Sequence, residues 1–323
     1  MGLQNMPPPQ QSAAPLAVTR GAPVHVAGHW TAEDLSLDLL DGRGFPLQTI
    51  RGPGLRHAAT SSAQTLAAML ADWDQRYGLL PVLLSGLAEI PAGWRKADPT
   101  VCPIAVEEIP GTVVRFTAQD RTVGLVPGLT CLSRMGCSDY LWGEETILAG
   151  AASLYPDLLH GAKAVCVPGP RTRWIILRHG RVLHFTTSLQ GEVFRLLADD
   201  PPAGNSRNRI IQPDIFQRGM QEADCNEIDL LYLLHQARCR NLDGEITAAD
   251  IPSFLLGLLL RREVAAADRL LRLGKRSSVV LIADEMQAYL YGRAFEAQGL
   301  GAAVVDRSRA ITAGLYRIAT ACA

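Results

Sequence analysis

The sequence predicts an α/β fold, and three features of the 323 residues point to it. Short apolar runs bounded by Gly and Pro are typical of strands. Segments with apolar residues at helical spacing lie between these runs. The length is sufficient for two domains of ordinary size, and 48% hydrophobic residues with a mean hydropathy of +0.09 indicate a large core.

The clearest stretch is 165–197, which we interpret as three strands followed by a helix. The Pro-Gly-Pro sequence at 168–170 forces a sharp turn after the first strand. Arg-His-Gly-Arg at 178–181 predicts a two-residue hairpin turn, because Gly supplies the positive φ that such a turn needs. Gln-Gly-Glu at 190–192 then begins a helix. A ligand can approach the backbone closely at the Gly-Pro turn and at this helix start.

The remaining elements follow from the same rules. We expect further strands at 25–30, 35–39, 45–50, 81–85, 113–116, 123–126, 278–283 and 302–305. We expect helices at 65–77, 144–154, 207–220, after a cap at Asn226, at 251–273, after Asp284, and from a cap at Ser308. Gly78 and Gly299 are suited to ending two of these helices, and Thr247 with Asp250 forms a capping-box pattern.

Charge and composition exclude several classes of protein. A net charge of −1 and a pI near 6.7 give no electrostatic case for binding nucleic acid or an anionic membrane. No apolar run is long enough to span a membrane, and the first residues do not resemble a signal peptide. The seven cysteines show no C-x-x-C spacing, which indicates a reduced cytoplasmic location and argues against a zinc site.

Composition also suggests a division of the chain. Residues 1–20 are rich in Pro, Gln and Ala without periodicity, so we interpret them as a disordered tail, with a docking peptide as the alternative. We place an N-terminal α/β domain at 21–130 and a C-terminal α/β domain at 131–323.

Several motifs resemble one family of sugar-acid kinases. They are VPGL at 126–129, DYLWGEET at 139–146, PGPRTRW at 168–174 and FTTSLQGE at 185–192. In order and spacing they are similar to the 2-keto-3-deoxygalactonate kinase family, and the resemblance extends over roughly 24–321. It implies a two-domain ribonuclease H-like fold, as in actin and hexokinase, with a cleft between the domains.

The resemblance also implies an activity and a site. The activity is ATP-dependent phosphorylation of 2-dehydro-3-deoxy-D-galactonate at its 6-hydroxyl, in galactonate degradation. The implied cofactors are Mg²⁺ and ATP. The implied partner is a small sugar-acid substrate, and a homodimer is an option. The implied catalytic residues are Asp139, Glu144 and Glu145; the substrate-binding residues are Gly86, Trp94, Gly191 and Glu192; the nucleotide-binding residues are Gly169, Arg171 and Arg173. No residue is assigned as a metal ligand.

The chain departs from the family pattern at the loops that would touch ligands. His29 and Thr31 replace a metal-associated Asp and a Gly, and the carboxylates of Glu33 and Asp34 stand where phosphate oxygens would lie. Pro170 removes a backbone N–H from the central turn. Ile-Pro at 90–91 replaces a polar pair in the sugar loop, and Asp284 with Glu285 replaces a Gly-Thr helix start.

These departures leave alternatives open for the implied residues. The acids at 144–145 are equally suited to capping the following helix, where carboxylates favour the helix dipole. Arg171 and Arg173 are equally suited to binding an anion or to lying solvated at a strand edge. Two functions therefore compete: a sugar-acid kinase with a remodelled nucleotide site, and a catalytically impaired homologue that binds another anionic metabolite or a protein partner.

Overall fold

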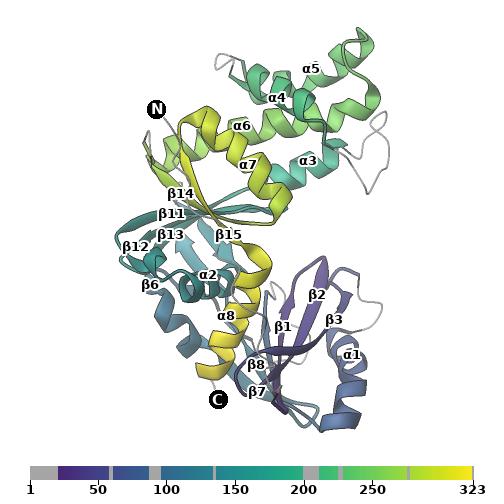
Figure 1. Cartoon of the computed structure of the whole chain (residues 1–323), viewed down its shortest axis with the longest axis vertical. Coiled ribbons are helices and arrows are strands. Elements are labelled where there is room, and N and C mark those ends of the chain that lie inside the picture. The colour runs from purple at the N-terminus through teal and green to yellow at the C-terminus, as the bar shows by residue number, and fades with distance from the viewer. Residues whose placement is uncertain are drawn as a thin grey trace, which may run out of the picture.

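The computed structural model describes residues 21–57, 61–86, 96–133, 136–198, 211–224, 228–274 and 277–321, which contain three sheets and eight α-helices. The predicted tail at 1–20 lies outside these ranges. The α/β class predicted from the sequence is confirmed. Figure 1 shows helices on the outside and in the middle of the molecule, with the two larger sheets on either side of the middle.

The first half is built on a six-stranded sheet of order β3-β2-β1-β4-β8-β7. β1, β2 and β3 form an antiparallel meander, β4 and then β8 continue the sheet in parallel, and β7 returns antiparallel. The bounds are β1 (Pro23–Trp30), β2 (Asp34–Asp41), β3 (Pro46–Pro53), β4 (Val82–Ser85), β7 (Val114–Ala118) and β8 (Arg121–Leu125). Helix α1 (Ser62–Tyr77) packs on this sheet through Leu66, Leu70 and Trp73.

The second half repeats this design in a sheet of order β15-β14-β11-β12-β13-β6. β11, β12 and β13 form the antiparallel meander, and β14 and β15 continue it in parallel. The bounds are β6 (Ile104–Ala105), β11 (Ala162–Val167), β12 (Thr172–Arg178), β13 (Arg181–Ser188), β14 (Ser278–Ala283) and β15 (Gly301–Asp306). Five strands thus have the same order and directions in both sheets, whereas β6 pairs antiparallel with β13, at the edge opposite to that which β7 occupies in the first sheet.

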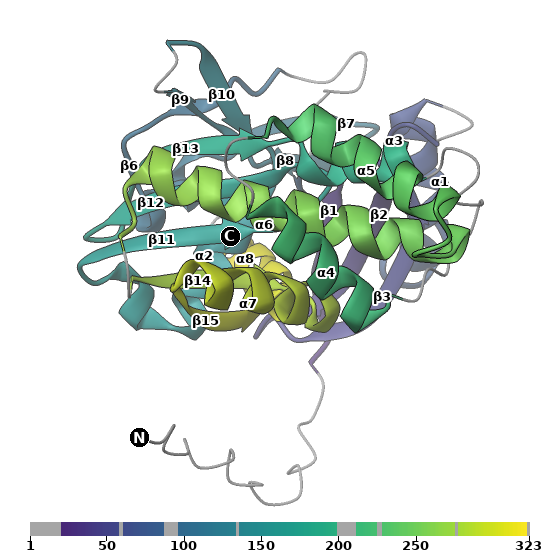
Figure 2. The same ribbon diagram turned by 90° about the horizontal axis from the view of Figure 1, so that it is seen from above.

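Five helices belong to the second half: α3 (Gln190–Ala198), α4 (Pro213–Ala223), α5 (Leu230–Leu242), α6 (Ile251–Leu271) and α7 (Glu285–Gln298). α6 and α7 bury their apolar side chains against Cys166, Trp174 and Leu281 of the sheet. Figure 2 shows these helices layered over β11 and β14. Three short 3₁₀ helices, η1 (Val106–Thr112), η2 (Pro156–Leu159) and η3 (Ala248–Asp250), connect other elements.

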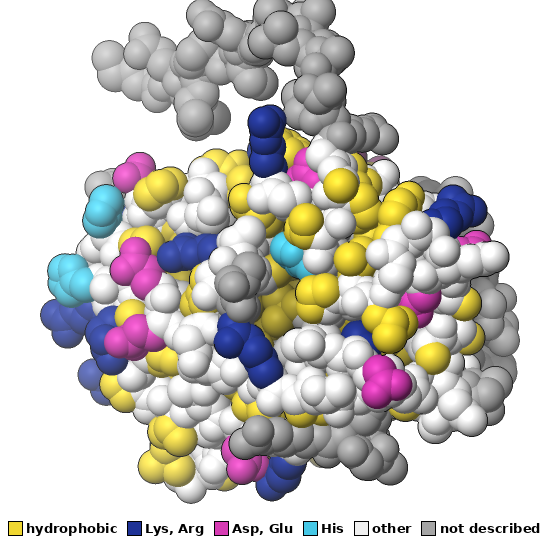
Figure 3. Space-filling model, turned by 90° about the horizontal axis from the view of Figure 1, so that it is seen from below, with side chains coloured by type: hydrophobic (Ala, Val, Ile, Leu, Met, Phe, Trp, Pro, Cys, Tyr) yellow, Lys and Arg dark blue, Asp and Glu magenta, His cyan; other side chains and the backbone are white. Residues whose placement is uncertain are grey.

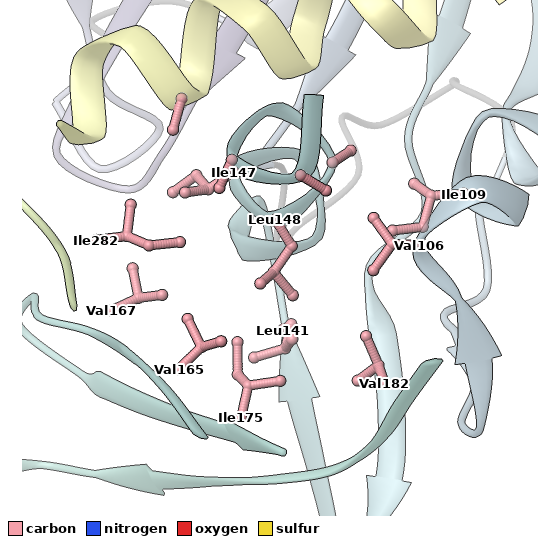
Figure 4. Close-up of a cluster of buried hydrophobic side chains, with 14 of the residues drawn as sticks. Val106, Ile109, Leu141, Ile147, Leu148, Val165, Val167, Ile175, Val182 and Ile282 are labelled. Carbon is pink, nitrogen blue, oxygen red and sulfur yellow. The ribbon is translucent and has the colours of Figure 1, made fainter. Parts of the chain in front are cut away.

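Two helices lie between the halves, α2 (Glu144–Leu154) and α8 (Arg307–Ala321). They cross so closely that a Cβ on Gly150 would lie 1.8 Å from the carbonyl oxygen of Ala310. The largest hydrophobic cluster surrounds them and includes Ala27 and Leu83 of the first sheet. Figure 4 shows Ile147 and Leu148 of α2 pointing toward Val165 and Ile175 of the second sheet. The two halves therefore share one core.

A small third sheet, β10-β9-β5, was not predicted. Its strands are β5 (Thr100–Val101), β9 (Leu129–Leu132) and β10 (Ser138–Leu141). Strands of two to four residues carry too little alternation to be recognised, and β5 pairs with β9 from far along the chain. This sheet leads directly into the start of α2.

Four predicted helix starts were wrong, and the first of these helices, α1, begins at Ser62 after a Ser61 cap rather than at 65. α4 begins at Pro213 rather than 207, and Pro is well suited to the first helical position. Asp229 caps α5 by accepting a hydrogen bond from the N–H of Leu231, so Asn226, which lies outside the described residues, is not the cap. The carboxylate of Asp306 accepts from the N–H of Arg309, and α8 begins before Ser308. In the last two cases an Asp carboxylate lies closer to the helix start than the predicted cap.

Surface charge and helix composition are relevant to binding nucleic acid or a membrane. Basic and acidic side chains are interspersed among hydrophobic ones on the face shown in Figure 3. Among the residues that the structure describes, no helix is both long and apolar enough to cross a lipid bilayer.

Candidate active site

The candidate site lies where the ends of β1 and β4 meet the start of α2. His29, near the end of β1, is only 8% exposed. Its ring packs against Gly86, which follows β4, and Gly143, which precedes α2. A Cβ on Gly143 would lie 2.5 Å from Cε1 of His29, and φ is +103° at Gly143 and +89° at Gly86. Both positions therefore require glycine, and the histidine ring joins the two halves.

The imidazole of His29 is held in its neutral form. Burial, followed by the charge of Arg307, lowers the pKa of His29 to about 4, although Glu144 and Asp34 act in the opposite direction. Nδ1 of His29 is buried without a hydrogen-bond partner in the described part of the chain.

The three implied catalytic acids do not form one cluster. Glu145 is fully buried, and its Oε2 accepts a hydrogen bond from the N–H of Gly143 at 2.7 Å. Its Oε1 accepts from the hydroxyls of Ser85 at 3.3 Å and Thr146 at 3.2 Å. Burial, and then the neighbouring charge of Glu144, raises the pKa of Glu145 to about 7. Glu145 thus ties the end of β4 to the start of α2.

Glu144 faces the other side of the helix start. Its Oε2 accepts from the N–H of Trp142 at 2.9 Å, and its Oε1 accepts from Nε of Arg173 at 3.3 Å. The Glu144 side chain keeps 15% of its surface exposed. Two donors therefore fix the orientation of a carboxylate that remains accessible.

Asp139 reaches Glu144 through intermediates rather than directly. Oδ1 of Asp139 accepts from the hydroxyl of Thr187 at 2.6 Å, and that hydroxyl accepts a short hydrogen bond from Nη1 of Arg173. Arg173 then contacts Glu144. Asp139 therefore orients Arg173 and does not meet the other two acids.

The turn between β11 and β12 brings together residues that the sequence had divided between two sites. Arg171 pairs with Glu192 at 3.0 Å, and the N–H of Glu192 donates to the carbonyl of Pro170 at 2.8 Å. A Cβ on Gly191 would lie 2.3 Å from the carbonyl oxygen of Gly169. The implied substrate residues Gly191 and Glu192 and the implied nucleotide residues Gly169 and Arg171 thus adjoin one another.

The turn between β1 and β2 satisfies its own polar groups. The hydroxyl of Thr31 accepts from the N–H groups of Glu33 at 3.2 Å and Asp34 at 3.1 Å, and donates to Oδ1 of Asp34 at 2.6 Å. The carboxylate of Glu33 pairs with Arg56 at 3.1 Å and lies 3.2 Å from His57. At the start of α7, Asp284 likewise caps the helix through the N–H of Gln287. The N–H groups of Glu33, Asp34 and Gln287 therefore already donate within the chain.

Not every implied residue can be placed, and some nearby residues were not anticipated. Trp94 and the altered pair at 90–91 lie outside the described residues, whereas Gly86 lies at the site. Sequence reasoning did not assign Thr187 or Arg307 to the site. Thr187 lies in the 185–192 motif but had no implied role, and Arg307 belongs to no recognised motif. In the described ranges, no three His, Cys, Asp or Glu side chains are grouped as a metal site would require.

Comparison with known proteins gives the family. The sequence pattern of the 2-keto-3-deoxy-galactonokinase family matches residues 34–318. This chain belongs to that family. The match begins at Asp34, so the end of β1 and most of its turn, where His29 and Thr31 depart from the motif, lie outside the matched stretch.

Individual relatives of this kinase family agree with the match. A Rhizobium meliloti protein named as a probable 2-dehydro-3-deoxygalactonokinase is 32% identical over 249 residues, 75% of this chain and 78% of that protein. The Escherichia coli 2-dehydro-3-deoxygalactonokinase is 28% identical over 270 residues, 81% of this chain and 86% of that protein. A crystal structure assigned as the same enzyme from Sinorhizobium meliloti superposes with a TM-score of 0.79 at 28% identity, covering 92% of this chain and 99% of that one. The chain has the predicted actin/hexokinase-like fold.

Proposed function

We propose that this protein is a sugar-acid kinase that transfers the terminal phosphoryl group of ATP to the 6-hydroxyl of 2-dehydro-3-deoxy-D-galactonate. Membership of the family and the names of two relatives support the reaction. The same comparisons give no support to a catalytically impaired homologue. Because the reaction uses ATP, we infer a cytoplasmic location for the enzyme.

The observation that carries the proposal is the position of Glu144. Its carboxylate is accessible at the start of α2, between the two sheets, and is oriented by the N–H of Trp142 and by Arg173. A kinase must orient the acceptor hydroxyl and remove its proton as the new P–O bond forms. We assign that role to Glu144. Asp139 positions Arg173 through Thr187, and Glu145 holds the backbone of Gly143.

The family implies ATP and, with it, a divalent cation. Mg²⁺ prefers oxygen ligands and is commonly held by one or two carboxylates together with substrate phosphates. His29 is a poor ligand of this kind, but the carboxylate of Asp34 is exposed in the turn between β1 and β2, where the hydroxyl of Thr31 orients it. Asp34 therefore fits as the protein ligand, and the cation would neutralise charge on the phosphates. The sequence suggested that the carboxylates of Glu33 and Asp34 repel phosphate. For Glu33 this repulsion is reduced, because its carboxylate pairs with Arg56 and lies near His57.

An acceptor-dependent assay tests the function. Purified protein with Mg·ATP should release ADP when 2-dehydro-3-deoxy-D-galactonate is added, and the product should carry phosphate on C6. An analogue that lacks the 6-hydroxyl is the control and should leave only background ATP hydrolysis. No acceptor-dependent ADP from protein with a normal melting transition would reject the proposal and favour the non-catalytic homologue.

A further inference from the structure

Three arginines surround the turn between β11 and β12, and they differ in their partners. Arg171 pairs with Glu192 at 3.0 Å, and Arg173 pairs with Glu144 at 3.3 Å. Arg307 is half-buried, yet within the described ranges its guanidinium forms no ion pair. Its hydrogen bond goes from Nη1 to the carbonyl oxygen of Pro168, at 2.6 Å. A guanidinium has five N–H donors, so most of those of Arg307 remain available.

Arg307 also occupies a central position. It is the first residue of α8, at the end of the helix nearest the second sheet. Its Nη1 lies 3.9 Å from the place that a Cβ on Gly169 would occupy, and its charge acts on the ring of His29. Glu144, the proposed proton acceptor, acts on the same ring. Arg307 therefore lies directly at the turn between β11 and β12, beside Gly169, which the family resemblance assigns to nucleotide binding.

Three backbone positions near the site cannot donate to a ligand. Pro170 has no N–H, and the N–H groups of Glu33 and Asp34 already donate to Thr31. A phosphoryl group in transfer carries negative charge on its equatorial oxygens and needs donors or cations around it. Among the arginines of this turn, Arg307 is the one whose charge is not already matched by a carboxylate in the described residues.

We propose that Arg307 binds the terminal phosphate of ATP and stabilises it during transfer, an inference that rests on the proposed kinase function. The guanidinium supplies charge-assisted hydrogen bonds to the phosphate oxygens. Because the contact is to the transferred group, it distinguishes ATP from ADP.

Calorimetric titration with Mg·ATP and Mg·ADP tests the contact directly. Arg307→Gln should weaken Mg·ATP binding by about tenfold to a hundredfold, as expected for a lost charge-assisted hydrogen bond, and Mg·ADP binding by no more than about threefold. Arg307→Lys keeps the charge but loses the planar set of guanidinium donors, so its affinity for Mg·ATP should lie between those of Arg307→Gln and wild type. Arg309→Gln, an exposed arginine two residues further along α8, is the matched control and should change neither affinity.

Turnover measured on the same variants separates this inference from the function. If wild type phosphorylates the sugar acid, Arg307→Gln should lower kcat by about a hundredfold or more, with a melting midpoint like that of Arg309→Gln. Unchanged kcat and unchanged Mg·ATP affinity in Arg307→Gln would overturn the inference while the function stands. Arg307-dependent Mg·ATP binding without turnover would uphold the inference and reject the function. No Mg·ATP binding to wild type would reject both.

Discussion

At the residue scale, neighbouring acids have separate roles because of where the helix begins. Successive residues of an α-helix point about 100° apart. Glu144 and Glu145 therefore leave the first turn of α2 in different directions, one toward Arg173 and the other toward Ser85. The sequence showed that acids are concentrated at 139–145 but not which of them is accessible. Arg307 lies far along the chain from these residues, so only the fold shows that it belongs to the site.

Substituting the two glutamates separately tests this division of roles. Glu144→Gln should lower kcat by about 10² to 10⁴, the usual contribution of a general base, and should leave the melting midpoint nearly unchanged because Gln still accepts hydrogen bonds. Glu145→Gln should instead destabilise the fold by about 1 kcal/mol, since one oxygen replaces two buried acceptors, and should reduce kcat less than tenfold. Steady-state kinetics and thermal unfolding of both variants measure the two effects. The reverse pattern would identify Glu145 as the proton acceptor.

At the element scale, local signals predicted most of the fold. The hairpin between β12 and β13 turns through His179 and Gly180, with φ of +48° and +72°, as the Gly at this position indicated. Asp284 and the capping box at 247–250 begin helices where expected. Contacts between segments far apart in the sequence were harder to predict. β5 and β9 are too short to be recognised, and the crossing of α2 with α8 depends on glycines that have no local signature.

The α2–α8 crossing gives a prediction at this scale. Gly150→Ala would place a methyl group 1.8 Å from the carbonyl oxygen of Ala310, so the two helices must separate. We expect a loss of about 1–3 kcal/mol in the free energy of unfolding, as in other overpacked cores. Gly292→Ala is the control, because its added Cβ meets nothing within 4 Å and Ala favours a helix interior. Urea denaturation of both variants provides the measurement, and equal stability would contradict the crossing.

At the scale of the whole molecule, two sheets of similar design carry unequal layers. The first sheet is covered by α1, and the second by α6 and α7 with the helices around them. The resemblance to a kinase family predicted this two-domain arrangement. The boundary at 130–131 stays a prediction, because the last helix, α8, packs against β1 of the first sheet as well as α2. The position of an element along the chain therefore does not by itself determine the domain to which it belongs.

The second half also contains a buried carboxylate that links stability to pH. Oε1 of Glu263 accepts from Nε1 of Trp174 at 2.9 Å, and Oε2 accepts from the hydroxyl of Tyr291 at 3.0 Å, so one side chain joins β12, α6 and α7. Burial outweighs these hydrogen bonds and raises the pKa of Glu263 from 4.5 to about 7. The folded state therefore favours the protonated form.

The sign of the pH effect follows from that shift. Because the folded pKa lies above the unfolded value, the contribution of Glu263 to stability is greatest below pH 4.5, falls as the pH rises to 7, and is constant above it. At about 1.4 kcal/mol per pKa unit, the decrease is about 3 kcal/mol. Glu263→Gln remains neutral and should lack this dependence, so the unfolding free energy of wild type minus that of the variant should fall by that amount between pH 4.5 and 7. Urea denaturation across this range tests the expectation, and a difference that stays flat would mean that Glu263 is ionised in the folded protein throughout.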